Sequence, residues 1–256
     1  MGSMKWCAHL AHLRFKALET CHVPHAITTR EWGSLNPFVG YELPRRLQTG
    51  IGSAPTSTVT QRLVIAEEIH ASDVHVCSPT DGGSIRLGVD GLISDNPDLM
   101  LMVYFSDCVP LLLLDPIRNV VAVLHGSRRS LLKGLIGRAA TLMENRYGTV
   151  MRDVLVGLGP ALRVCCYEIR EDIFPELEAA GWMRFVRDTS DGLRLDLIEG
   201  CKSLLLLSGV AEEHVEDSGL CTVDDSSRFF SARNRLSSDE RGASLAALIS
   251  APERKR

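Results

Sequence analysis

The feature that most constrains the fold is an apolar stretch, SDCVPLLLLDPIRNVVAVLHGS, at residues 106–127. One polar segment, DPIRN, divides it into two runs, and its Asp, Pro and Asn residues favour a turn. Each run is apolar throughout rather than alternating, which is typical of strands buried on both faces. The sequence therefore predicts a buried hairpin, with Cys108 inside the first strand and His125 at the end of the second, across from it.

The rest of the chain reads as one mixed α/β domain. Its 256 residues are 45% hydrophobic and 23% charged, enough for a sizeable core, and no repeat or long linker divides them. We interpret residues 4–250 as a single domain, residues 1–3 as a cloning remnant and residues 251–256 as a basic tail. Helices are predicted at 57–69, 128–148, 195–208 and the end of the domain, strands at 70–79, 99–115, 119–127 and 154–162, and a loop at 40–58.

Charge and cysteine usage exclude several classes of protein. A net charge of -4 gives no general attraction to nucleic acid or to an anionic membrane. The longest apolar runs are too short to span a bilayer, and no secretory signal pattern is visible, so the predicted compartment is the cytoplasm. The eight cysteines include no C-x-x-C pair, which argues against a zinc ribbon and for reduced thiols.

Three side chains near strand ends are candidates for chemistry: His70, Cys108 and His125. Two nitrogens and one sulfur form a set that zinc takes readily, and three protein ligands leave a fourth position for water. The alternative is structural, because a thiol in an apolar strand is more often inert core and a lone imidazole is often simply hydrogen-bonded. Spacing alone leaves both interpretations open.

Arginines surround these candidates. Arg30 follows two threonines, and Arg128 and Arg129 follow His125 at the start of a predicted helix. Guanidinium groups and helix N-terminal amides together suit a phosphate, although solvated surface arginines would give the same pattern. Arginine opposes the helix dipole at this end, which favours a functional reason for the pair.

These residues lie within a series of motifs that resembles the multicopper polyphenol oxidase, or laccase-domain, family. The series is SDCVPLLLLD, VVAVLHGSRRS, VGLGPAL with CCYEI, and CTVDD with FFSARN. It begins near ITTREWGSLN and ends near RGASLAAL, so the resemblance covers nearly the whole chain. The resemblance implies an α+β fold: a single domain with mixed, largely buried sheets covered by helices in α/β/β/α layers.

The resemblance also implies an activity and a site. Family members cleave adenosine, inosine, guanosine and methylthioadenosine with phosphate and deaminate adenosine, using zinc held by residues that fall here on His70, Cys108 and His125. The expected partners are therefore a purine nucleoside and phosphate, with a homodimer as one assembly to consider. Arg30 and Arg129 become candidates for phosphate or ribose contact. Asp107 becomes a candidate proton donor or a residue that orients a ligand.

This chain departs from the family pattern beside the expected site. The family's Gly-Trp-Arg-Gly is replaced by residues 127–130, SRRS, so only Arg129 is retained. Losing the tryptophan and the glycines removes a stacking face and close backbone approach. These changes affect the expected substrate preference and rate more than metal binding.

The residues leave open three alternatives to a zinc-dependent purine nucleoside phosphorylase with adenosine deaminase activity. A copper-dependent polyphenol oxidase would use the same His and Cys ligands, but the chain has no His-x-His pair and only eight histidines. A cysteine hydrolase would need only Cys108 as nucleophile and His125 as base. A non-enzymatic relative would keep a structural metal and bind a partner.

Overall fold

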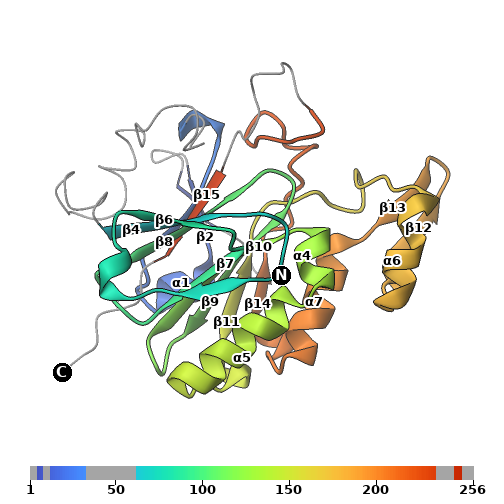
Figure 1. The fold of residues 1–256 in the computed structure, drawn as a ribbon. Helices are drawn as coiled ribbons and strands as arrows, with labels where there is room; N and C mark the ends of the chain where they lie inside the picture. The colour runs from blue at the N-terminus through green and yellow to red at the C-terminus, as the bar shows by residue number, and fades with distance from the viewer. Residues whose placement is uncertain (1–4, 8–11, 33–61, 235–244, 250–256) are drawn as a thin grey trace.

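The computed structural model describes residues 5–7, 12–32, 62–234 and 245–249, which form two large sheets, a small hairpin and a few helices (Figure 1). The seven-stranded sheet runs, in spatial order, β1 (Lys5–Cys7), β2 (His12–Arg14), β3 (His25–Thr28), β15 (Leu245–Ile249), β8 (Met100–Phe105), β4 (Leu63–Glu67) and β6 (Ser84–Leu87). The six-stranded sheet runs β14 (Val215–Asp217), β11 (Leu155–Leu158), β9 (Val109–Asp115), β10 (Val120–Gly126), β7 (Gly91–Ser94) and β5 (Val74–Val76).

The described helices are short and lie mainly beside the six-stranded sheet. They are α1 (Lys16–Thr20), α4 (Arg128–Leu132), α5 (Leu135–Tyr147), α6 (Phe174–Ala179) and α7 (Leu197–Leu207). Single 3-10 turns occupy Arg30–Trp32, Pro79–Asp81, Met151–Asp153, Glu171–Ile173, Met183–Phe185 and Glu212–His214. Helix α6 and the hairpin of β12 (Val186–Thr189) and β13 (Gly192–Leu195) form a projection at the right of Figure 1.

The predicted hairpin is confirmed. Strands β9 and β10 pair antiparallel with Val120 opposite Asp115 and Gly126 opposite Val109. The buried Asp115 carboxylate accepts two backbone N–H bonds from the turn that follows it, each 2.9 Å long. This side-chain-to-backbone turn is the reason an Asp can end an otherwise apolar strand.

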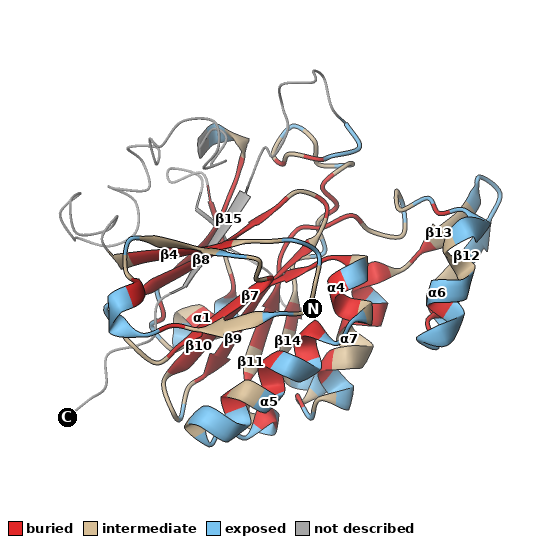
Figure 2. Ribbon diagram, in the orientation of Figure 1, coloured by how far each residue is buried: buried red, intermediate tan, exposed pale blue. Residues whose placement is uncertain are grey.

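Both faces of the hairpin are buried, which explains its continuous apolar sequence. Leu112, Leu114 and Val121 face the seven-stranded sheet, where they share a core with residues such as Val64 and Leu101. The alternate residues face α4, α5 and α7 in a second core. Figure 2 shows these two strands buried along their whole length. The α+β fold with mixed, buried sheets is therefore confirmed.

Three predicted elements differ in the structure. The described part of the helix predicted from Ser57 is strand β4, because Leu63–Glu67 lies between β6 and β8 in a sheet. The helix predicted at 128–148 is divided at Gly134, whose φ of 89° is open to glycine but costly for other residues. The closing helix is strand β15, paired on both sides by β3 and β8. In each case tertiary pairing or backbone conformation outweighs local propensity.

The predicted strand at 99–115 is also two strands. It breaks at residues 106–108, and its two halves, β8 and β9, belong to different sheets. Cys108 therefore lies in the connection between the sheets, not inside a strand. The loop predicted at 40–58 and the boundaries at residues 3 and 251 lie outside the described residues. No helix in the described part of the chain is long and apolar enough to cross a membrane.

Candidate metal centre

The strand topology brings His70, Cys108 and His125 to one place. Strands β4 and β8 are parallel neighbours, so both end on the same side of the sheet. The segment after β4 carries His70, and the segment after β8 carries Cys108. The chain then crosses to the other sheet as β9, and β10 returns antiparallel to it. His125 near the end of β10 therefore lies beside the start of β9. The site thus forms where the two sheets meet.

The three ligand atoms converge as the sequence predicted. Cys108 Sγ lies 4.0 Å from Nε2 of His70, and all three candidate ligand atoms lie within 4.8 Å of one another. The two imidazole rings meet edge to face with their centroids 5.1 Å apart. His125 is buried, Cys108 is half-buried and His70 is exposed, so the cluster is open to solvent on the His70 side.

This geometry fits a zinc ion. Zinc–sulfur and zinc–nitrogen bonds of about 2.3 and 2.0 Å at tetrahedral angles place such ligand atoms about 3.5 Å apart. The Cys108–His70 distance needs to shorten by only a few tenths of an ångström to reach this value. Two imidazoles and one thiolate also leave one coordination position for water or substrate, as catalytic zinc sites do.

Asp90 fixes the orientation of two of these candidate ligands. The carboxylate is buried, and Oδ1 accepts hydrogen bonds from His125 Nδ1 at 3.2 Å and from the His70 backbone N–H at 3.0 Å. Oδ2 accepts the backbone N–H of Ala71 at 2.8 Å and of Ile69 at 3.4 Å. With Nδ1 engaged, Nε2 of His125 is left free to bind a metal, as in many zinc proteins.

The electrostatics of the cluster favour a thiolate. Burial opposes ionisation of Cys108, but the His125 and His70 imidazoles outweigh it and lower the pKa of this thiol to about 7. Burial also opposes a charge on His125, but Cys108 and Asp90 raise its pKa well above the ordinary value. For Asp90, the bonds from His125 and the backbone outweigh burial and lower its pKa. Metals bind the thiolate form, so this environment prepares Cys108 as a ligand.

Backbone strain marks the same place. His70 and Asp107 have positive φ values of 58° and 78°, a conformation that is uncommon for residues other than glycine. Asp107 is held there by two bonds: Thr222 Oγ1 donates to Oδ1 at 2.6 Å, and the Leu162 N–H donates to its carbonyl at 2.8 Å. Strain that is fixed by neighbours in this way is often found at functional sites. Asp107 therefore positions the segment that carries Cys108.

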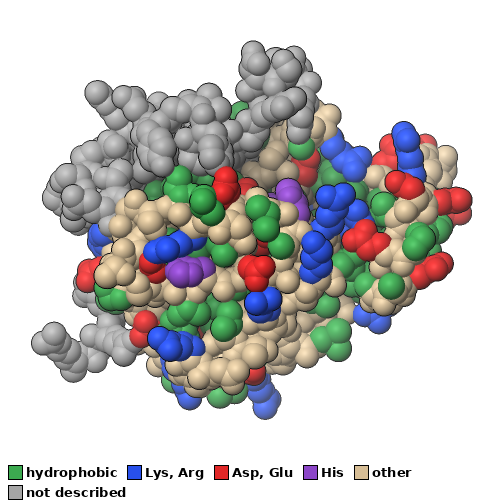
Figure 3. Space-filling model, in the orientation of Figure 1, with side chains coloured by type: hydrophobic (Ala, Val, Ile, Leu, Met, Phe, Trp, Pro, Cys, Tyr) green, Lys and Arg blue, Asp and Glu red, His purple; other side chains and the backbone are tan. Residues whose placement is uncertain are grey.

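An open cavity of about 380 Å³ lies on the projection side of the cluster. Its walls include Arg128, Arg170, Arg233 and Tyr167, and the Arg233 guanidinium lies 5.1 Å from the centre of the Tyr167 ring. Burial raises the pKa of Tyr167, the nearby Arg128 guanidinium opposes this increase, and Cys108 adds to it. Figure 3 shows a histidine at the surface beside basic side chains where the main body meets the projection.

The arginines that were expected to bind phosphate occupy different places. Arg128 lines the cavity and forms an ion pair with Glu176, whereas Arg129 is exposed and is not among the residues that line that cavity. Arg30 donates from Nη1 to the Phe229 carbonyl at 3.3 Å. The roles of Arg30 and Arg129 stay predictions, and Arg128 joins them.

Sequence reasoning did not select Asp90, Tyr167 or Arg233 as site residues. Of these three, only Asp90 has a local sequence signal: it is a single acidic residue between Val89 and Gly91, just before a buried strand. By itself, however, this pattern indicates only a turn or the end of a strand. Tyr167 and Arg233 lie far from the ligands in sequence, so only the fold connects them with the site.

Comparison with known proteins places this chain in a family. Residues 48–250 match the family described as multi-copper polyphenol oxidoreductase laccase. The crystal structure of YlmD from Geobacillus stearothermophilus superposes with a TM-score of 0.82 at 26% identity, covering 99% of this chain and 100% of that one. This chain therefore belongs to the laccase-like multi-copper polyphenol oxidoreductase family, as its motifs predicted.

Its relatives carry more specific names. "Purine nucleoside phosphorylase YlmD" of Geobacillus stearothermophilus is 30% identical over 188 residues, which is 68% of this chain and 67% of that protein. "Purine nucleoside phosphorylase" of Bacteroides thetaiotaomicron is 26% identical over 234 residues, 83% of this chain and 86% of that protein. The hypothetical protein YfiH of Bacillus licheniformis shares the fold, with a TM-score of 0.82 at 23% identity over 97% of this chain and 99% of that one.

Proposed function

We propose that this protein is a purine nucleoside phosphorylase that uses a zinc ion held by His70, Cys108 and His125. The observation that carries the proposal is the convergence of these three ligand atoms in front of the Asp90 carboxylate. The names of the relatives support the reaction class. We further propose that it deaminates adenosine at the same site and accepts inosine, guanosine and methylthioadenosine.

The cavity arginines supply the charge that phosphorolysis needs. Zinc, when bound, contributes a Lewis acid beside the substrate. Arg128 and Arg233 present guanidinium groups that would hold phosphate facing C1′ of the ribose. Phosphate then forms a bond to C1′ as the bond to the purine nitrogen breaks, and a proton from the attacking dihydrogen phosphate passes to that nitrogen, giving the free base and ribose 1-phosphate.

Asp107 acts in this scheme as a positioning residue. Its carboxylate is nearly buried and accepts the short Thr222 hydrogen bond, so it holds the strained connection before Cys108. In deamination, water adds at C6 of adenine and ammonia leaves, which converts adenosine to inosine. In both reactions the protein would hold His70, Cys108 and His125 in place and keep solvent away from the buried His125 side chain.

The test is incubation of the zinc-loaded protein with adenosine and phosphate, followed by separation of the products. Adenine with ribose 1-phosphate is expected from phosphorolysis, and inosine with ammonia from deamination. A Cys108→Ser variant serves as the control and should lose both activities. If the fully loaded protein gives neither adenine nor inosine, the proposed enzyme activity is wrong.

Metal analysis and one variant distinguish the proposed zinc enzyme from two other kinds of enzyme. Metal analysis that finds copper, together with oxidation of a phenol, would support the polyphenol oxidase alternative. A cysteine hydrolase would need only Cys108 and His125, so a His70→Ala variant would stay active. Under the zinc proposal, His70→Ala loses metal and activity together, because it removes one of three protein ligands.

A further inference from the structure

A second group of metal-ligating side chains lies apart from His70, Cys108 and His125. We call Cys165, Cys166, Cys221 and Asp224 the thiol cluster. Strands β11 and β14 are parallel neighbours, so the segments that follow them run side by side. A parallel bridge between Ala161 and Cys221 continues this pairing past the strand ends. The fold therefore brings together cysteines that are more than fifty positions apart in sequence.

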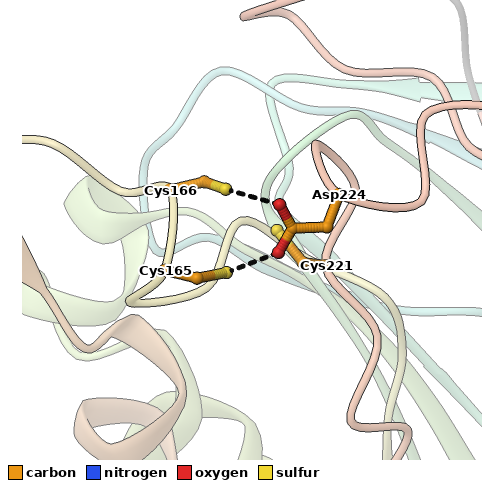
Figure 4. A group of neighbouring side chains, drawn as sticks. All are labelled: Cys165, Cys166, Cys221 and Asp224. Atoms are coloured by element: carbon orange, nitrogen blue, oxygen red, sulfur yellow. Dashed lines mark hydrogen bonds between the residues drawn. The ribbon is translucent and has the colours of Figure 1, made fainter.

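The side chains of the thiol cluster point toward one another (Figure 4). Cys165 Sγ donates to Asp224 Oδ2 at 2.9 Å, and Cys166 Sγ donates to Oδ1 at 3.1 Å. The ligand atoms of all four residues lie within 4.8 Å of one another. Cys221 is 4% exposed, while Cys165 and Asp224 reach the surface. One buried and three accessible ligands thus surround a common point.

Ordinary hydrogen bonding is a weak reason for this arrangement, because a thiol is a poor donor. A third group, made of His75, Cys77 and Asp81, shows how the carboxylate of such a cluster can instead be paired with basic side chains. There, Asp81 accepts from His75 Nε2 at 3.0 Å and forms an ion pair with Arg86. Among the described residues, the hydrogen bonds and ion pairs of Asp224 are to the cysteines of its own cluster. In the thiol cluster, by contrast, the hydrogen bonds to the Asp224 carboxylate at 2.9 and 3.1 Å come from thiols.

We propose that the thiol cluster binds a zinc ion as a closed, four-ligand structural site. Zinc takes cysteine sulfur at about 2.3 Å and carboxylate oxygen at about 2.0–2.2 Å, and its structural sites use four protein ligands. The carboxylate favours zinc over monovalent copper, which prefers soft sulfur ligands. Zinc replaces three thiol protons, two that now bond Asp224 and the one on Cys221, and these protons pass to solvent. The four ligand atoms already lie within 4.8 Å of one another, so binding requires only small side-chain movements.

The position of this site gives it a consequence for the candidate active site. Thr222, next to Cys221, donates to Asp107, and Leu162 bonds the Asp107 carbonyl. Tyr167, next to Cys166, lines the cavity. A zinc ion that joins these two segments would hold both the strained Asp107 connection and one wall of the cavity. Zinc binding at the thiol cluster does not require the proposed reaction to be correct, since none of its ligands belongs to the first cluster.

Metal analysis of the full-length protein tests this proposal. The background is His70→Ala/Cys108→Ser, which removes two ligands of the first cluster. Reduced protein is loaded with Zn²⁺, freed of excess by gel filtration and assayed for zinc by mass spectrometry. We expect one zinc ion per chain in this background and none after the further change Cys165→Ser/Cys166→Ser. The control Cys21→Ser, a half-buried cysteine outside both clusters, should keep its zinc.

A milder variant guards against misfolding. Asp224→Asn changes one accessible side chain and should weaken zinc binding. A chelator concentration that leaves zinc in the His70→Ala/Cys108→Ser background should then remove it from the Asp224→Asn variant. The proposal is overturned if the background binds no zinc, if zinc remains after both cysteines are replaced, or if zinc-loaded protein contains a disulfide within the cluster. A wild-type protein that binds this zinc but does not cleave nucleosides would refute only the proposed function.

Discussion

Asp90 joins the two histidines of the candidate metal centre through one oxygen atom. Its Oδ1 lies 3.2 Å from the Nδ1 atom of His125 and 3.0 Å from the backbone nitrogen of His70. The carboxylate thus sets both the tautomer of one ligand and the loop position of the other. Because Asp90 is fully buried, water cannot reach the two nitrogen atoms to take over its hydrogen bonds unless the surrounding residues move.

We expect Asp90→Asn to weaken zinc binding at the first cluster by about 10–100-fold, the usual cost of losing a carboxylate behind a histidine ligand. Competition with a chelating dye measures this, in a Cys165→Ser/Cys166→Ser background. Asp115→Asn is the matched control, since Asp115 is equally buried but lies at the turn end of the hairpin. Unchanged affinity in Asp90→Asn would show that Asp90 does not orient the ligand.

Replacing Arg128 by alanine should raise the KM for phosphate by about 10–150-fold, which corresponds to the loss of hydrogen bonds to a charged group. Arg128 lines the cavity and its side chain is 13% exposed. Arg129→Ala is the control and should change the KM less, because Arg129 is exposed on α4. Steady-state kinetics with varied phosphate make the comparison, and a larger effect at Arg129 would restore the role that the motif predicted for it.

Thr222→Val should destabilise the protein by about 1–3 kcal/mol. The change leaves the nearly buried Asp107 oxygen without its 2.6 Å hydrogen bond while keeping the shape of the side chain. Urea unfolding gives the free energy of unfolding. Thr222→Ser retains the hydroxyl and should lose less stability. Equal stability losses in the two variants would assign the effect to packing rather than to this bond.

His25 should make the protein less stable in mild acid. It is buried, Nδ1 donates to the Val23 carbonyl and Nε2 accepts the Phe15 N–H, each at 2.8 Å, so the ring is held neutral. Burial lowers the pKa of His25 from 6.5 to about 4. Between these values the unfolded chain binds a proton that the folded protein does not. The contribution is complete above pH 6.5 and is lost as the pH falls toward 4, by about 3 kcal/mol in all.

Unfolding curves across this pH range test the assignment. His25→Gln keeps an acceptor near the Phe15 N–H but cannot titrate, so its stability should fall less between pH 6.5 and 4. His22→Asn controls for the loss of an exposed histidine, and asparagine tolerates the positive φ of 56° at this position. If His25→Gln and the wild type lose stability in parallel, His25 is not the group responsible.

The hairpin and the three candidate ligands follow from sequence because their signals are local. A continuous apolar run on each side of an Asp-Pro turn allows few structures other than a pair of buried strands. Residue type and position near strand ends selected His70, Cys108 and His125, and the family motifs supported the same set. The structure brings their candidate ligand atoms within 4.8 Å of one another. Prediction failed for β4 and β15, whose residues are strands only because neighbouring strands pair with them on both sides.

The sequence by itself determined which elements are buried and which side chains are candidates for chemistry, because hydrophobic pattern and residue type are properties of short segments. Only the tertiary structure decided where those elements meet. It divided one predicted strand between two sheets, so that Cys108 lies at their junction. It also set Asp90 behind His125, placed Arg128 in the cavity and gathered the thiol cluster. Each of these contacts joins residues distant in the chain, and their pairing depends on strand order and register, which local sequence does not encode.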